Sequence, residues 1–319
     1  MILKNNIIWS ATDGSQGMIS QANGLASKLN SEIVEIKTDL ILPWSKLQPG
    51  ILPPFKWIFK NNIPNDHLPK ILISCGRKSV YLSLYLKKKY KKIINIHIQN
   101  PKTSFKNFNF IVAPNHDQIK GPNIINSIGA LHHFNLNNNE SDKKFLNIKS
   151  NNLVTCIIGG ENQHYKFGKE ETTNLCNNLL SIIKENPSLN LLVITSRRTS
   201  NYIKNILKYK LKDFAKIWSG EGENPYSFAI KNSAYFILTS DSTSMISESA
   251  ISGKPIYIFQ LPFKRTSKRM ESFHNEFKNL NITRNFNNTK KLEIWDYKPL
   301  NETKRIAGII KKRIIEEYL

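Results

Sequence analysis

Residues 240–255 have the sequence SDSTSMISESAISGKP and indicate the fold more directly than any other segment. One apolar, strand-like run (Ala234 to Thr239) leads into it, and another (Ile256 to Phe259) leaves it. Asp241, Ser242 and Ser244 are good N-cap residues, so a helix is expected to begin here. The glycine and the proline at the end of the stretch should stop that helix. The pattern predicts a β–α–β unit of a parallel sheet.

The start of this helix also suggests a ligand. The first turn of a helix offers unpaired backbone N–H groups, which suit an anion such as a phosphate. Glu248 lies one turn further on, on the same face as Ser244, where its carboxylate could accept both hydroxyls of a ribose. An ordinary, capped β–α–β unit without a ligand is the alternative.

The same alternation extends in both directions. In the second half, strands are expected at 153–158, 191–195 and 216–219. Helices are expected around 170–184, after 199 and, as a short helix, after the turn at 224–226. In the first half, strands are expected at 6–10, 32–36, 70–74, 93–99 and 109–113, with helices at 19–29 and 80–89. Residues 42–64 interrupt this pattern with five prolines and several aromatic residues.

These patterns predict the domain organisation. The predicted fold class is α/β, with two Rossmann-like domains facing across a cleft and a C-terminal helix that returns to the first domain. The expected boundaries are 1–138 for the first domain, 139–152 for a polar linker, 153–300 for the second domain and 301–319 for the returning helix.

The bulk composition narrows the class of protein. The chain has 319 residues, of which 40% are hydrophobic, and a formal net charge of +22. Such a charge can attract nucleic acid, anionic membranes or phosphorylated substrates, but a solvated lysine-rich surface is the simpler interpretation. Nucleic-acid binding is not expected, because no stacking-aromatic or helix-turn-helix motif accompanies the charge.

Several features bear on the location of the protein in the cell. Cys75, Cys156 and Cys176 are widely spaced and are expected to be reduced core thiols. Neither a membrane-spanning stretch nor a signal peptide is evident, so a cytoplasmic protein is expected. The aromatic and basic segment 42–64 could bind the inner face of an anionic membrane peripherally, although packing against the sheet is the alternative.

Ligands of parallel sheets bind where the strands end, and polar clusters occur at those positions. In the second half they are Gly159, Gly160, Ser196, Arg197, Arg198, Asn224, Pro225 and Tyr226. Glycines let a phosphate approach, and guanidinium groups match phosphate oxygens in pairs. In the first half they are Asp13, Gly14, Gly17, Arg77, His116 and Asp117, of which Asp13 and His116 could act as a general base. Plain turns and solvated charge pairs are the alternatives.

Taken in order, these motifs resemble a known family. Trp9-Ser10-Ala11-Thr12-Asp13-Gly14, Ser74-Cys75-Gly76-Arg77, Pro114-x-His116-Asp117, Thr195-Ser196-Arg197-Arg198-Thr199, Glu223-Asn224-Pro225-Tyr226 and Asp241-Ser242-x-Ser244-Met245-x-x-Glu248 are similar to those of the mitochondrial fission ("elongated mitochondria") family, which has many bacterial members. More distantly, the second half resembles the donor half of GT-B glycosyltransferases. In those enzymes a glutamate of the corresponding helix holds the donor ribose, which implies that role for Glu248.

The function expected from residues and resemblance together is metal-independent transfer of a sugar from a nucleotide diphosphate-sugar, with an acceptor at a membrane surface. The donor would contact Gly159, Gly160, Ser196, Arg197, Arg198, Asn224, Pro225, Tyr226, Asp241, Ser242, Ser244, Met245 and Glu248. Asp13, His116 or Asp117 would be catalytic, with Gly14, Gly17 and Arg77 on the acceptor side. No cofactor and no metal are expected. The alternatives are a non-enzymatic recruitment protein and a sugar-nucleotide epimerase.

Overall fold

The computed structural model describes residues 7–29, 32–64, 68–136, 145, 148, 152–287, 289 and 291–318. The chain divides into two compact units. Unit 1 comprises residues 1–133 and 301–319, and unit 2 comprises residues 134–300. Most of the predicted linker 139–152 lies outside the described residues. Within it, Phe145 packs against Phe228 of unit 2 with ring centroids 5.5 Å apart.

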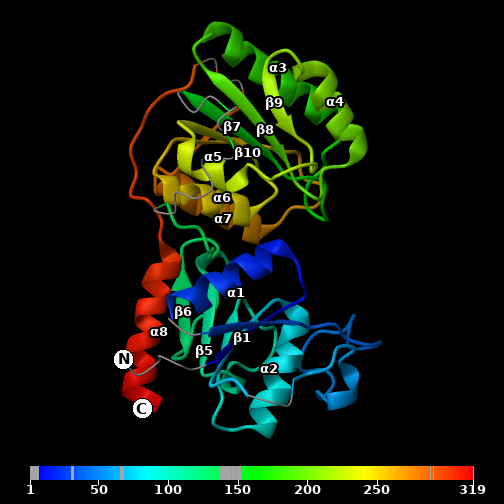
Figure 1. The fold of residues 1–319 in the computed structure, drawn as a ribbon, viewed down its shortest axis with the longest axis vertical. Helices are drawn as coiled ribbons and strands as arrows, with labels where there is room; N and C mark the ends of the chain where they lie inside the picture. Colours follow the sequence, from blue (N-terminus) through cyan, green and yellow to red (C-terminus); the bar gives the residue numbers. More distant parts are fainter. Residues whose placement is uncertain are drawn as a thin grey trace. The chain divides into compact units, whose positions relative to one another are not determined.

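Unit 1 is built on a parallel sheet of six strands in the order β2-β1-β3-β4-β5-β6 (Figure 1). Its elements are β1 (Ile7–Thr12), α1 (Gln16–Lys28), β2 (Glu32–Lys37), β3 (Ile71–Cys75), α2 (Arg77–Lys89), β4 (Ile94–Ile98), β5 (Phe110–Pro114), β6 (Ile124–Ser127) and α8 (Glu302–Tyr318). Short 3-10 turns lie at Lys56–Ile58, Phe105–Asn107 and Asn115–Asp117.

The side chains of these strands pack alternately into two apolar layers, because successive residues of a strand point to opposite faces of the sheet. Ile8 packs with residues of α1 and α8 on one face, whereas Trp9 packs with residues of α2 on the other. Helix α8 contributes Ile306, Ile310 and Ile314, which are fully buried at helical spacing. The predicted return of the C-terminal helix to the first half is confirmed.

Unit 2 carries a second parallel six-stranded sheet, in the order β12-β11-β10-β7-β8-β9. Its elements are β7 (Leu153–Ile158), α3 (Lys169–Glu185), β8 (Asn190–Thr195), α4 (Asn201–Leu211), β9 (Ala215–Trp218), α5 (Tyr226–Asn232), β10 (Tyr235–Thr239), α6 (Thr243–Ser249), β11 (Ile256–Phe259), α7 (Lys268–Asn279) and β12 (Thr283–Asn285). The predicted α/β class, with two Rossmann-like sheets, is confirmed.

The unit predicted around residues 240–255 forms as β10–α6–β11, and the Ser242 hydroxyl caps α6 by accepting a hydrogen bond from the N–H of Met245. Gly253, at φ +70°, ends the short 3-10 turn (Ala250–Ser252) that continues this helix. Three elements escaped the sequence analysis: β6, α7 and β12. Ser267 caps α7 and places Lys268 and Arg269 in its first turn.

All three cysteines are buried free thiols, as predicted. Burial raises the pKa of the Cys176 thiol to about 11, so that it is protonated at neutral pH. None of the described helices combines the length and the apolar character that crossing a membrane requires.

Candidate functional site

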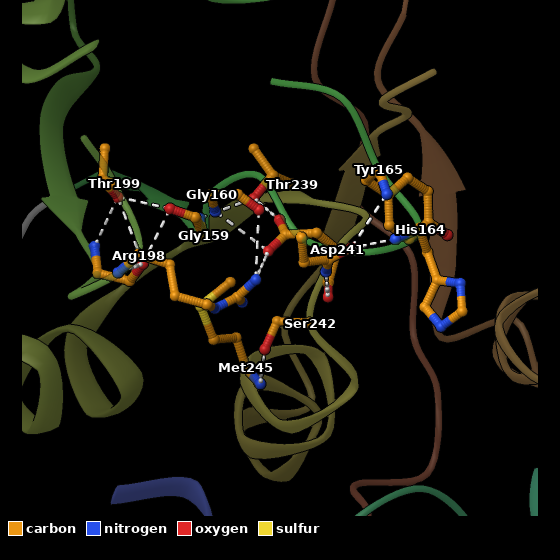
Figure 2. A network of polar contacts seen from close by, with 12 residues as sticks. Gly159, Gly160, His164, Tyr165, Arg198, Thr199, Thr239, Asp241, Ser242 and Met245 are labelled. Atoms are coloured by element: carbon orange, nitrogen blue, oxygen red, sulfur yellow. Dashed lines mark hydrogen bonds and ion pairs between the residues drawn. The ribbon is translucent and has the colours of Figure 1, made fainter. Parts of the chain in front are cut away.

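Three loops of unit 2 converge on the carboxylate of Asp241, at the edge where β7, β8 and β10 end (Figure 2). Asp241 Oδ1 accepts a hydrogen bond from the Thr239 hydroxyl at 2.6 Å, and Oδ2 accepts one from the Gly160 N–H at 3.1 Å. Arg198 Nη1 lies 2.6 Å from the same Oδ2, and the Asp241 side chain is fully buried. Because the carboxylate is dry and has three partners, it holds the three loops together.

The two glycines after β7 are required by this arrangement. A Cβ on Gly159 would overlap the Asp241 carboxylate, and a Cβ on Gly160 would overlap the backbone of Arg198. The sequence pattern predicts that a ligand phosphate uses this room. In the structure the close approach is made by the protein's own groups, so a phosphate contact at these glycines stays a prediction.

Hydroxyl groups fix the end of β7 from the β8 side. The Ser196 hydroxyl donates to the Gly159 carbonyl at 2.8 Å, and the Thr199 hydroxyl donates to the same oxygen at 2.5 Å. The backbone N–H of Arg198 in turn donates to the Ser196 hydroxyl at 3.1 Å. These contacts make the β7 and β8 loops one rigid edge.

Two side chains that were predicted to bind the donor lie beside this edge without a bonding partner in the described part of the chain, Arg197 and Ser244. Arg197 is exposed, and Ser244 is half-buried in the first turn of α6. Neither side chain makes a hydrogen bond or an ion pair within the residues that the structure describes. The neighbouring Arg198 differs, since its charge is matched by Asp241. A cation without a protein partner is the better candidate for an anionic ligand.

Glu248 lies in a second cluster of unit 2. Its Oε2 accepts a hydrogen bond from the Tyr226 hydroxyl at 2.6 Å, and only 8% of Glu248 is exposed. The Tyr226 ring lies against Phe134, with centroids 5.5 Å apart. Burial and the adjacent carboxylate raise the pKa of Tyr226 well above its ordinary value, so the phenol keeps its proton. A ribose at Glu248 would have to share this carboxylate with Tyr226.

The Asn224–Tyr226 motif begins α5. The Asn224 side-chain oxygen accepts a hydrogen bond from the Tyr226 N–H at 3.0 Å, and Pro225 occupies the N-cap position. This explains the spacing of the motif locally, because an Asn two residues ahead fixes the turn into the helix. The structure thus brings two predicted donor-binding residues, Tyr226 and Glu248, into direct contact.

In unit 1, Asp13 and Gly14 form the turn between β1 and α1. The Asp13 carboxylate accepts a hydrogen bond from the Ser15 N–H at 2.9 Å, and Gly14 adopts φ +89°. Gly17 lies in the first turn of α1, where its carbonyl accepts from the Gln21 side chain. Asp13 is half-buried, so its carboxylate is partly accessible.

The His116–Asp117 pair follows β5 at the same edge of the unit 1 sheet. Asp117 Oδ2 accepts a hydrogen bond from the Asn100 N–H at 3.2 Å, which joins the loops after β4 and β5. His116 is only 2% exposed. Of the two bases proposed from the sequence, Asp13 is therefore the more accessible.

Arg77 begins α2, and its guanidinium group holds backbone carbonyls. It donates to Leu47 at 2.6 Å, and also to Ser45 and Trp44. These bonds tie the proline-rich segment to α2, as does the Tyr81 hydroxyl, which donates to the Gln48 carbonyl at 2.9 Å. An acceptor-binding role for Arg77 would have to come in addition to this structural one.

Two residues that build the unit 2 edge were not predicted from the sequence. Thr239 supplies a hydroxyl to Asp241 (Figure 2). The Asn162 side-chain oxygen accepts hydrogen bonds from the N–H groups of His164 and Tyr165, and its amide group donates to the Asp241 carbonyl at 3.3 Å. Their partners lie up to about 80 residues away in sequence, so local spacing carried no signal. Within the described residues, no group of three or more His, Cys, Asp or Glu side chains could hold a metal ion.

Comparison with solved structures identifies the architecture. A UDP-GlcNAc 2-epimerase from Neisseria meningitidis, bound to UDP-GlcNAc, matches with a TM-score of 0.53 at 13% identity, covering 98% of this chain and 100% of that one. MurG from Acinetobacter baumannii matches with a TM-score of 0.50 at 10% identity, covering 97% and 99%. The fold is therefore the GT-B-like α/β fold of these proteins.

Sequence comparisons give the family. An uncharacterized protein of Rickettsia prowazekii is 30% identical over 95% of this chain and 97% of that protein. The mitochondrial fission protein ELM1 of Arabidopsis thaliana is 24% identical, over 77% of this chain and 64% of the plant protein. A family model described as mitochondrial fission ELM1 matches residues 16–314. Since that match spans nearly the whole sequence, the chain belongs to the mitochondrial fission ELM1 family.

Proposed function

We propose that this protein binds a nucleotide diphosphate-sugar at the carboxyl edge of the unit 2 sheet and transfers the sugar to an acceptor hydroxyl without a metal. The observation that carries the proposal is the rigid edge around Asp241, beside which Arg197 and Ser244 have no partner in the described part of the chain. Support comes from a neighbour of the same fold whose structure contains UDP-GlcNAc.

In this proposal each group has one role. Arg197 and the polar start of α6, from Ser242 to Met245, would face the diphosphate, while Arg198 keeps the loops in place through Asp241. Glu248 would accept the ribose hydroxyls, and the Asn224–Tyr226 turn would contact the base. A hydroxyl of the acceptor would lose its proton to Asp13 as it attacks the anomeric carbon, and the nucleoside diphosphate would leave.

Calorimetric titration with UDP, GDP and their sugar derivatives tests this proposal. The wild-type protein should bind one of these ligands, and Arg197→Gln should weaken binding about 10- to 100-fold, the range for one charged hydrogen-bonding group. Lys208→Gln on α4 is the charge-matched control and should leave the affinity unchanged. Absence of binding for the whole panel, or equal affinities for Arg197→Gln, Glu248→Gln and wild type, would overturn the proposal.

Epimerisation of a sugar nucleotide is a second candidate, because several neighbours of this fold are UDP-GlcNAc 2-epimerases. The two reactions are separated by their products. An epimerase converts the sugar nucleotide to its isomer without an acceptor, whereas a transferase releases the nucleoside diphosphate only when an acceptor is added. Chromatography of the reaction mixture with and without acceptor distinguishes them.

Peripheral binding to an anionic membrane is a separate proposal for segment 42–64. Leu42, Ile51, Phe55 and Trp57 are exposed there by 43–64%, and the rings of Phe55 and Trp57 stack with centroids 5.7 Å apart. Aromatic rings next to lysines favour the interface of a bilayer. Co-sedimentation with vesicles should fall when Phe55 and Trp57 are both replaced by Ser, and unchanged sedimentation would contradict this proposal.

A further inference from the structure

A hollow of about 440 Å³ in unit 1 is lined by four lysines, Lys87, Lys88, Lys91 and Lys106, together with Pro54, Leu84 and Asn107. Two of these lysines lie in the last turn of α2, one follows that helix, and one lies in the 3-10 turn Phe105–Asn107. No carboxylate is among the lining residues that the structure describes. The hollow is thus a concentration of positive charge without internal compensation.

The rim of this hollow is held by buried hydrogen bonds. Asn95, which is fully buried, donates from its side chain to the Asn107 carbonyl at 2.9 Å, and its side-chain oxygen accepts from the Asn109 N–H at 3.0 Å. Lys87 Nζ donates to the Asn109 side-chain oxygen at 2.8 Å and to the carbonyls of Ile93 and Lys91 at 2.7 and 3.1 Å. The loops that carry the lysines are therefore fixed relative to one another.

Lys87 differs from the other three lysines. Its three donors are all occupied by neutral oxygens, so its charge stays unneutralised, and burial lowers its pKa. Lys88, Lys91 and Lys106 are exposed and make no ion pair within the described residues. Lys87 thus supplies a fixed positive charge, while the exposed ammonium groups of the other three lysines are available to donate hydrogen bonds.

Two simpler explanations account for only part of this arrangement. Lysines in the last turn of a helix are stabilised by its dipole, which explains Lys87 and Lys88. The helix dipole does not explain Lys91, which follows α2, or Lys106, which lies in the 3-10 turn Phe105–Asn107. A lysine-rich composition predicts cations spread over the surface, with acids among them, whereas the described lining of this hollow holds none.

We propose that this lysine hollow is a binding site for a phosphate group, either on an anionic lipid or on a soluble phosphate compound. The volume is in the range of small-ligand sites, and several ammonium groups around one dianion match its charge. The site lies at the far end of α2 from Arg77, so within unit 1 it is separate from the edge that carries Asp13 and Asp117. It does not depend on nucleotide-sugar binding by unit 2.

The test compares two triple variants with the same loss of charge. Lys88→Gln/Lys91→Gln/Lys106→Gln removes the three exposed positive charges of the hollow. It keeps Lys87, whose hydrogen bonds hold the rim. Lys169→Gln/Lys208→Gln/Lys212→Gln removes three exposed lysines from unit 2. Each protein is titrated with inorganic pyrophosphate by calorimetry, and sedimented with vesicles of phosphatidylcholine with or without phosphatidic acid. Circular dichroism checks that both variants are folded.

The hollow variant is expected to bind roughly a hundredfold more weakly, at several-fold per lysine near an anionic surface, while the control triple stays close to wild type. Loss with vesicles alone identifies a lipid headgroup, and loss with pyrophosphate alone identifies a soluble phosphate. Equal losses in both triples, or no loss in the hollow variant, would overturn the proposal. Pyrophosphate binding that depends on Arg197 and not on the hollow would also overturn it for the soluble ligand.

Discussion

Arg198 Nη1 lies 2.6 Å from Oδ2 of Asp241, and the two side chains differ sharply in exposure: 40% for the arginine and none for the aspartate. The pair joins the loops after β8 and β10. Because the carboxylate is dry, it depends on every donor around it, whereas water can replace the partner of the arginine. This asymmetry makes Asp241 the structural member of the pair.

Replacing Arg198 by Gln should therefore cost stability, because it leaves the buried Asp241 carboxylate without its cation. Asp241→Asn keeps the size of the side chain but turns one acceptor into a donor that faces the Gly160 N–H or the Thr239 hydroxyl. We expect each single replacement to lower the free energy of unfolding by about 1–3 kcal/mol. In an Asp241→Asn background, Arg198→Gln should cost less than about 1 kcal/mol, because no buried charge is left to match. Urea unfolding of the two single variants and the double variant measures these losses, and an equal cost of Arg198→Gln in both backgrounds would contradict this expectation.

Gly159→Ala tests whether the glycine accommodates Asp241. The added Cβ would overlap the carboxylate, so the variant should be destabilised by about 1–3 kcal/mol, as overpacking of a filled site usually is. In an Asp241→Ala background the same substitution should cost clearly less, because the overlapping group is gone. Such non-additivity in a double-mutant cycle is the expected result. Additive losses would mean that Gly159 is needed for another reason.

The sequence predicted the elements of both sheets that are long and strictly patterned. Apolar runs such as 153–158 became fully buried strands, and the spacing of Ile306, Ile310 and Ile314 predicted the buried face of α8. The short strands β6 and β12 were missed, since runs of four and three residues with mixed polarity give little periodic signal.

The candidate site was predictable only in part. The sequence pointed to Gly160, Asp241 and Arg198 as a ligand-binding set, because these residue types follow strands that end at one edge. It could not tell that they bind one another, since the contacts join residues about 40 and 80 positions apart. Likewise, Glu248 was singled out from its helix position, but its contact with Tyr226 depends on the packing of α5 near α6.

The Tyr226–Glu248 hydrogen bond should make stability depend on pH in the alkaline range. Burial and the carboxylate raise the pKa of Tyr226 in the folded protein above its ordinary value of 10.0. Above that pH the unfolded chain releases the phenolic proton while the folded chain retains it, so folding should weaken as pH rises. Wild type should therefore lose more stability between about pH 9 and 11 than Tyr226→Phe.

Other buried tyrosines also titrate in this range, so the comparison must be the difference between the two proteins at each pH. Near pH 7 the Phe variant should be less stable by about 1–2 kcal/mol, the value of one hydrogen bond to a charged group. The gap should narrow as pH rises. A constant difference across the range would mean that Tyr226 is not the group that titrates.

His97 should make unit 1 sensitive to acid. The ring is 1% exposed, its Nδ1 lies 2.8 Å from the Ser74 hydroxyl, and burial lowers its pKa from 6.5 to about 3. Between these two values the unfolded chain binds a proton that the folded chain excludes, so stability should fall as pH drops below about 6.5, by about 1.4 kcal/mol per pH unit. Buried His132, with a pKa lowered to about 4, should add to the effect.

Hydrogen exchange of peptides from β3 and β4, measured by mass spectrometry between pH 7 and 5, checks this expectation within unit 1. After correction for the intrinsic exchange rates, protection in the wild type should fall toward pH 5. His97→Gln keeps an acceptor for Ser74 but cannot be protonated. The protection of the variant should therefore fall less steeply with pH than that of the wild type, by the contribution of one titrating group. His164→Gln in unit 2 is the control and should leave the slope in β3 and β4 unchanged. If His97→Gln and wild type lose protection in parallel, the acid sensitivity arises from other groups, of which His132 is the next to test.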